Sequence, residues 1–229
     1  MLAAGCGNSG SKDDTTTTSG SSSRSPKAAA CTYTSDGSQP AKPATAPPGT
    51  PTATTVTSAT INTNRGAIKV TLDGDKTPCT VNSFLSLAKQ GYFDNTKCHR
   101  LTTQGIYVLQ CGDPSGTGGG GPGYKFADEL LKNDARIAPC QGSGTQQVCN
   151  YAAGTLAMAN AGPGTNGSQF FLVYGDSPLQ PAYTVFGHMD ASGLKVVKAI
   201  AKDGIGAATP GMGAGDGAPK KPVIITSVK

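Results

Sequence analysis

Short runs of alternating apolar and polar residues begin near residue 56 and continue to the end of the chain. Two runs rich in β-branched residues, 57–61 and 67–72, flank Asn-Thr-Asn-Arg-Gly, which predicts a hairpin of two strands. Short apolar runs bounded by turn residues are typical of further strands. We expect these around Leu101 and at 106–109, 155–159, 169–174, 184–189 and 223–228.

Two segments have helical spacing instead. Between residues 77 and 91 apolar residues recur at intervals of three and four, which predicts a helix that Thr77 caps and Gly91 ends. A shorter helix is expected over 194–201, with Ser192 as its cap. Many strands with two helices at separate places favour a β-barrel or sandwich with helical plugs.

The first 55 residues differ in composition from the rest of the chain. Residues 13–25 are nearly all Thr, Ser and Gly, and residues 42–55 are dominated by Pro, Ala and Thr. Such segments have too little apolar surface to offset the entropy lost on folding. We therefore expect residues 1–55 to be a disordered tether, dispensable for activity, and residues 56–229 to be one folded domain.

The start of the chain is similar to the lipobox of bacterial lipoproteins, in which a Cys thiol receives a diacylglycerol. Leu-Ala-Ala-Gly precedes Cys6, which we predict to be the lipidated residue. The basic and apolar regions of a signal are missing before it, so we expect the natural start to lie upstream of Met1. A chance match is the alternative. The lipidated reading predicts an extracytoplasmic protein anchored to the cell membrane.

Composition and charge exclude several classes of protein. Charged residues are 14% and Gly accounts for 32 of 229 residues, which argues against a coiled coil or helical bundle. Apolar runs stay far below the roughly 20 residues of a membrane span. The net charge of +5 is scattered, so we expect no nucleic-acid partner. With only two His, we expect no metal site and no cofactor.

The chain has seven Cys, which are many for a cytosolic protein. It has no Cys-x-x-Cys motif, so a thioredoxin-type or zinc-ribbon site is not indicated. If Cys6 is lipidated, an even set remains, which favours disulfides in an oxidising compartment over buried free thiols. Cys140 and Cys149 flank a short Gly- and Ser-containing loop, and we predict that they bond. Cys98 has Cys111 and Cys79 as possible partners, and the sequence does not choose between them. The last of the six is Cys31.

Four segments in order carry a resemblance to a known family. They are FDNTKCHR at 93–100, VLQCGD at 108–113, MANAGPGTNGSQFF at 158–171 and YTVFG at 183–187. The chain from about residue 56 to 229 resembles a cyclophilin, a peptidyl-prolyl cis-trans isomerase, most of all the actinobacterial extracytoplasmic type. The resemblance implies a closed eight-stranded antiparallel barrel with a helix capping each end. It implies a monomer acting on proline-containing peptides and unfolded proteins during the folding of exported proteins.

The resemblance also assigns residues. Arg100 matches the catalytic arginine and Gln110 the glutamine that holds it and binds the substrate backbone. A guanidinium suits this reaction because the proline nitrogen gains a lone pair as the amide twists. A weakly catalytic proline-peptide-binding or chaperone module is the alternative function. The predicted substrate-binding residues are Tyr107, Val108, Ala159, Asn160, Ala161, Gln169, Phe171, Leu179 and Tyr183.

Overall fold

Alternation of apolar and polar residues produces a long hairpin in this computed structural model, which describes residues 30–208 and 213–229. β2 (Val56–Thr63) and β3 (Gly66–Asp73) pair antiparallel, and Ile61 faces Ile68 in the core. The other strands are β1 (Thr34–Ser35), β4 (Thr96–Lys97), β5 (Arg100–Thr102), β6 (Tyr107–Cys111), β7 (Tyr124–Lys125), β8 (Cys140–Gln141), β9 (Val148–Tyr151), β10 (Thr155–Met158), β11 (Phe170–Gly175), β12 (Ser177–Leu179), β13 (Val185–Met189), β14 (Ile205–Ala208), β15 (Asp216–Pro219) and β16 (Ile224–Val228).

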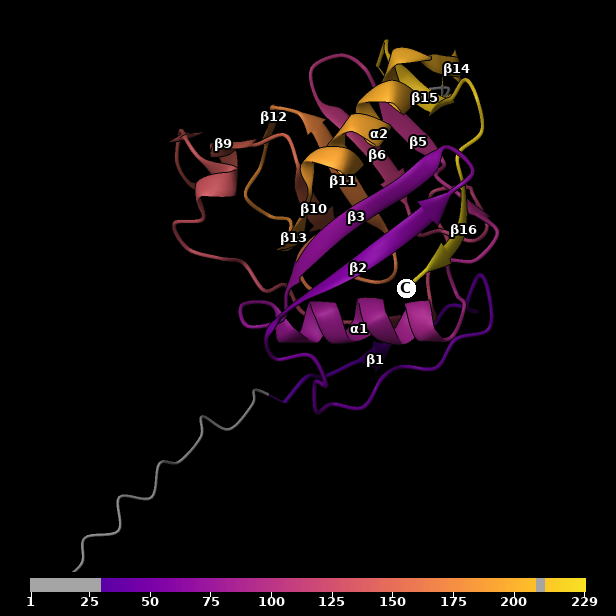
Figure 1. Ribbon diagram of the computed structural model, residues 1–229. Coiled ribbons are helices and arrows are strands. Elements are labelled where there is room, and N and C mark those ends of the chain that lie inside the picture. The colour runs from indigo at the N-terminus through magenta and orange to yellow at the C-terminus, as the bar shows by residue number, and fades with distance from the viewer. Residues whose placement is uncertain (1–29, 209–212) are drawn as a thin grey trace, which may run out of the picture.

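The main sheet is an open, curled half-barrel (Figure 1). Its 11 strands run in the order β14-β15-β5-β6-β11-β10-β13-β3-β2-β16-β4, so the expected closed barrel of eight strands is wrong. The reason lies in residues 96–102, where the strand is interrupted at Cys98 and His99. β4 before the break pairs with β16, whereas β5 after it pairs with β6 and β15. The hydrogen-bonded ladder therefore ends here instead of closing.

Helix α1 (Pro78–Lys89) covers one end of the curled sheet (Figure 1) and occupies the predicted segment. The Thr77 side chain does not cap it, because its hydroxyl donates to the carbonyl of Asp73 instead. The carboxylate of Glu129 accepts from the amides of Cys79 and Thr80 at 3.1 and 2.8 Å. A distant acidic side chain thus satisfies the free amides at the positive end of the helix dipole.

Helix α2 (Ala191–Lys202) covers the opposite end and starts earlier than the periodicity predicts. Its cap is Asp190, whose carboxylate accepts from the amide of Gly193 at 2.6 Å. The predicted cap, Ser192, instead donates its hydroxyl to Asp190. An Asp at this position accepts from the free amides, and its negative charge is also stabilised by the positive end of the helix dipole. Asp190 is therefore the cap in place of Ser192.

The predicted disordered tether is wrong for residues 30–55, which run beneath α1 as an ordered arm (Figure 1). Strand β1 pairs with β7, and a disulfide joins Cys31 to Cys79 at the start of α1. The ammonium group of Lys42 donates to the carbonyls of Gly91 and Asp94 at 2.6 and 3.0 Å. A covalent link and hydrogen bonds thus order an arm that has few apolar residues. Residue Cys6 lies outside the described residues.

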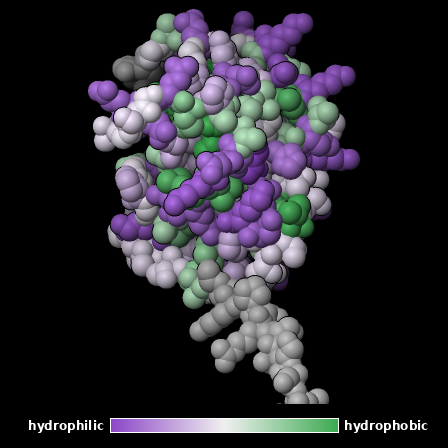
Figure 2. Space-filling view, turned by 90° about the vertical axis from the view of Figure 1, so that its left-hand side faces the viewer, coloured by the Kyte–Doolittle hydropathy of each residue, from purple (hydrophilic) through white to green (hydrophobic). Residues whose placement is uncertain are grey.

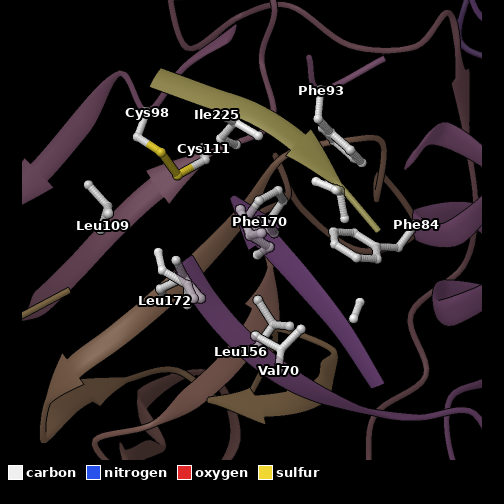
Figure 3. Packing of buried hydrophobic residues seen from close by; sticks show 14 of the residues in the cluster. Val70, Phe84, Phe93, Cys98, Leu109, Cys111, Leu156, Phe170, Leu172 and Ile225 are labelled. Atoms are coloured by element: carbon white, nitrogen blue, oxygen red, sulfur yellow. A yellow bond between two sulfur atoms is a disulfide. The ribbon is translucent and has the colours of Figure 1, made fainter. Parts of the chain in front are cut away.

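Aromatic rings join α1 to the sheet in the main core (Figure 3). The ring centroid of Phe84 on α1 lies 5.3 Å from Phe93 and 5.5 Å from Phe170 on β11. The Cys98–Cys111 disulfide lies at the margin of this cluster, near Ile225, as Figure 3 shows. These contacts close one end of the half-barrel with apolar side chains.

The Cys140–Cys149 disulfide is present, as predicted, and links β8 to β9. These strands form a small sheet with β12, so the long connection between β7 and β10 is an ordered flap. Cys98 bonds Cys111, which resolves the alternative that the sequence left open. The flap places Cys149 opposite Leu179 in the ladder of β9 and β12.

The side of the molecule that carries β9 and β12 mixes polar and apolar residues, as Figure 2 shows. Among the described residues, the large hydrophobic side chains that are exposed lie far apart in the sequence and are Val56, Leu130 and Val148. Within the described residues, no helix combines the length and the apolar character that crossing a membrane requires.

Candidate active site

Arg100 and Gln110 lie directly opposite each other on the paired strands β5 and β6. Opposite residues of an antiparallel pair point to the same face, so their side chains meet. The Nη1 group of Arg100 donates to Oε1 of Gln110 at 3.0 Å. The structure therefore brings together the two residues that the sequence predicts to be catalytic.

Asp216 on β15 holds the other side of the Arg100 guanidinium. Nε donates to the two carboxylate oxygens at 3.0 and 3.1 Å, and Nη2 donates to Oδ2 at 2.7 Å. The side chains are 28% and 12% exposed, respectively. Sequence analysis missed Asp216 because it lies 116 residues after Arg100, outside all four motifs. Only the pairing of β15 with β5 brings it to the site.

Gln169 continues the chain of polar contacts. Nε2 of Gln110 donates to Oε1 of Gln169 at 2.9 Å, and Nε2 of Gln169 donates to the carbonyls of Gly118 and Gly120. Asp113 holds that glycine-rich turn by accepting from backbone amides within it. Burial raises the pKa of Asp113, but these hydrogen bonds outweigh it and hold the pKa below its ordinary value. The amide orientations of Gln110 and Gln169 are thereby set.

A hollow of about 210 Å³ lies beside this polar chain. The ring of Phe171 lies edge-on to Tyr183, with centroids 5.5 Å apart, and Tyr151 lies behind both. The hydroxyl of Tyr151 donates to the carbonyl of Gln180, and burial raises its pKa to about 12, so it remains a neutral donor. The hollow is lined by Arg100, Ile106, Val108, Gln110, Ala159, Asn160, Phe171, Leu179 and Tyr183.

The structure places Tyr107 outside this hollow, and Ile106 lines it instead. Successive side chains of a strand point to opposite faces, so residues 106, 108 and 110 share the face toward the hollow. Tyr107 points to the other face, where its ring lies 5.8 Å from Tyr174. Alternation along β6, counted back from Gln110, was the signal that could have found Ile106.

A second, larger hollow of about 430 Å³ adjoins the first. Ala159 and Asn160 line both hollows, whereas Ala161 and Gln169 line only the second. Apart from Tyr107, the predicted substrate-binding residues thus divide between two adjoining hollows. The arm contributes to the second one through Asp36.

The chemistry available here is electrostatic. A fixed guanidinium borders an apolar depression, and the neighbouring polar groups are amides and one carboxylate. In the described part of the chain, no three His, Cys, Asp or Glu side chains come together as a metal site. A fixed guanidinium beside an apolar hollow suits stabilisation of a developing lone pair on a ligand that places a ring in the hollow.

His99 lies between β4 and β5 and is expected to make the folding stability depend on pH. Neither ring nitrogen has a hydrogen-bond partner among the described residues. Burial lowers the pKa of His99; the Asp113 carboxylate opposes this shift and the Arg100 guanidinium reinforces it. Because the unfolded chain then binds the proton more readily, folding stability is lost as the pH falls below about 6.5.

We expect His99→Gln to reduce this loss, which is at most about 1.4 kcal/mol per pH unit for one proton. Urea unfolding of both proteins between pH 7.5 and 5.5 measures it. His188→Gln is the matched control, since this side chain is exposed. Equal pH slopes for wild type and His99→Gln would contradict the assignment.

Known proteins similar to this chain belong to one family. The family model described as cyclophilin type peptidyl-prolyl cis-trans isomerase/CLD matches residues 58–229. A probable peptidyl-prolyl cis-trans isomerase B of Mycobacterium leprae is 49% identical over 207 residues, covering 87% of this chain and 66% of that protein. Its counterpart in Mycobacterium tuberculosis is 50% identical over 184 residues, covering 78% of this chain and 56% of that protein. The chain thus spans less than two thirds of the length of these relatives.

The fold has solved counterparts as well. The crystal structure of a Cryptosporidium parvum cyclophilin type peptidyl-prolyl cis-trans isomerase matches with a TM-score of 0.59 at 28% identity. The match covers 76% of this chain and 96% of that one. A structure of the same protein in the presence of the dipeptide Ala-Pro matches with a TM-score of 0.57.

Proposed function

Because this chain belongs to the cyclophilin-type peptidyl-prolyl cis-trans isomerase family, we propose that it accelerates rotation about X-Pro peptide bonds. The observation that carries the proposal is the guanidinium of Arg100, fixed by Gln110 at the edge of an apolar hollow. The hollow receives the pyrrolidine ring, and Phe171 forms its base. The guanidinium then lies beside the amide that must twist.

The reaction needs no nucleophile. The amide barrier is about 18–20 kcal/mol, and the uncatalysed rotation takes about 10–100 s. As the bond twists, resonance is lost and the proline nitrogen gains a lone pair, which an Arg100 N–H stabilises. One such preorganised donor contributes about 2.7–4 kcal/mol, and it acts in the transition state more than in the ground state. Positioning of the ring in the hollow lowers the barrier further.

The proposed substrates are proline-containing peptides and unfolded proteins. Ala159 and Asn160 border both hollows, so an extended peptide with its proline in the smaller hollow continues across them into the larger one. Recognition through the backbone and a proline ring tolerates varied neighbouring residues. The Ala-Pro dipeptide in the experiment on the Cryptosporidium parvum relative is of this class.

We also propose that the protein is a monomer that acts outside the cytoplasm on exported proteins, as an actinobacterial extracytoplasmic form anchored through Cys6. Three disulfides support an oxidising compartment. The lipobox-like start supports the anchor. Cell fractionation with mass spectrometry of the N-terminal peptide tests both, and a soluble cytoplasmic protein with unmodified Cys6 would contradict them. Size-exclusion chromatography tests the monomer.

A protease-coupled assay on a short X-Pro peptide tests the activity itself. We expect the purified protein to accelerate the slow phase in proportion to its concentration. Nuclear magnetic resonance exchange on the same peptide distinguishes the alternative function. Binding of the peptide with no acceleration of its cis–trans exchange would favour a proline-binding or chaperone module over an isomerase.

Phe171→Leu is expected to weaken peptide binding in a protein that still folds. A branched aliphatic side chain keeps the site apolar but removes the flat ring that contacts Tyr183. The stability loss should be about 1–2 kcal/mol, below the 3–5 kcal/mol typical of Phe→Ala truncations. We expect KM for the X-Pro peptide to rise at least about threefold, which is about 0.7 kcal/mol. An unchanged KM would show that Phe171 is not the base of the proline site.

A further inference from the structure

The hydrogen-bond inventory of Arg100 singles out a residue that neither the motifs nor the family match assigns. A guanidinium has five N–H groups in one plane. Two of them, on Nε and Nη2, are directed at Asp216, and one on Nη1 is directed at Gln110. Two N–H groups, one on each Nη, remain for a substrate.

The two partners have different effects on the guanidinium. Gln110 supplies a single hydrogen bond, around which the guanidinium plane is free to turn. Asp216 engages Nε and Nη2 side by side, which is the fork arrangement that fixes the plane of an arginine. The carboxylate thus determines which way the remaining N–H groups point.

Asp216 is itself held rigidly. It lies opposite Thr102 in the ladder of β15 and β5, and the residue as a whole is buried. The preceding Gly215 has φ +81°, and a Cβ there would lie 2.8 Å from Gln104 and 2.9 Å from Thr103. Its carbonyl accepts from the amide of Thr103 at 2.8 Å. The turn before β15 therefore aims the carboxylate and requires glycine to do so.

We infer that Asp216 is a positioning residue of the isomerase site, which holds the Arg100 guanidinium in the orientation that the twisted X-Pro amide needs. The inference rests on the proposed function. Asp216 does not line the hollow, so it acts through Arg100 and not through the substrate. Its loss should therefore affect the transition state and leave ground-state binding of the proline ring nearly unchanged.

The test compares Asp216→Asn and Asp216→Ala with wild type in the X-Pro peptide assay. We expect kcat to fall about 10-fold to 100-fold for the alanine variant, because a small misplacement of a catalytic group reduces the rate by up to about that factor. KM should change less than about threefold, which is about 0.7 kcal/mol. Asp216→Glu, which keeps the carboxylate, should recover part of the loss. Asp203→Asn is the control, because it removes the charge of Asp203 from the Arg65–Asp203 ion pair, and neither residue lines the hollow.

A second measurement does not depend on catalysis. The Nε–H resonance of Arg100 should be protected from exchange in wild type and lose that protection in Asp216→Asn. If wild type is inactive while the resonance is protected, the proposed function fails and the ion pair stands. The inference is overturned if folded Asp216→Asn and Asp216→Ala keep wild-type kcat, or if KM rises while kcat is unchanged. Should the alanine variant not fold, the isosteric asparagine variant decides.

Discussion

Replacing Arg100 by alanine is expected to lower kcat/KM about 10²–10³-fold, the effect of removing one preorganised donor from a charge-stabilising site. The guanidinium is the cationic group that lines the apolar hollow, and Gln110 cannot replace it because a side-chain amide carries no charge. The protease-coupled assay measures the loss. Activity within about fivefold of wild type, in a folded variant, would refute electrostatic catalysis by this residue.

Stability has to be followed in the same experiment. Removing Arg100 leaves the carboxylate of Asp216 without its cation, and an unpaired, largely buried charge is destabilising. Assays should therefore be run well below the melting temperature of the variant. Arg65→Ala is the matched control, because Arg65 forms a similarly exposed ion pair with Asp203 away from the hollow. We expect that control to keep wild-type kcat/KM.

Loss of the Cys31–Cys79 disulfide is expected to cost about 4 kcal/mol of folding stability. In the chain-entropy treatment the cost grows with the length of the closed loop, and this bridge spans 48 residues. The arm also loses its link to the start of α1, where the carbonyl of Cys79 accepts from the hydroxyl of Tyr33 at 2.7 Å. Denaturant unfolding of the double Cys→Ser variant measures the effect.

The matched control is removal of the Cys140–Cys149 bridge. It spans nine residues, so the same treatment predicts about 2.5 kcal/mol. The ordering of the two losses is the informative result. If the shorter bridge contributes more, the flap and not the arm is the part that depends on its cross-link. If neither variant is destabilised, the bridges do not form in the native protein.

The two helices and most of the longer strands were predictable because their patterns are local, whereas short strands such as β1, β8 and β12 were not predicted. Alternation predicted the hairpin of β2 and β3, and three- and four-residue spacing predicted α1. The arm was not predictable in this way, since its Pro- and Thr-rich composition indicates disorder. What orders it is a bond from Cys31 to a residue 48 positions away and hydrogen bonds to the far end of α1. Composition indicates how much apolar surface a segment can bury, but it does not reveal bonds to distant parts of the chain.

The same distinction divides the site. Motifs in the sequence were enough to indicate the family and, through that resemblance, to assign Arg100 and Gln110, because each lies within a contiguous run of residues. The motif match assigned Tyr107 to the hollow, and the structure puts Ile106 there, because the alternation of side chains along the strand sets which face each one takes. The fold alone placed Asp216 against Arg100. That contact depends on the pairing of β15 with β5 across 116 residues, which no local pattern specifies.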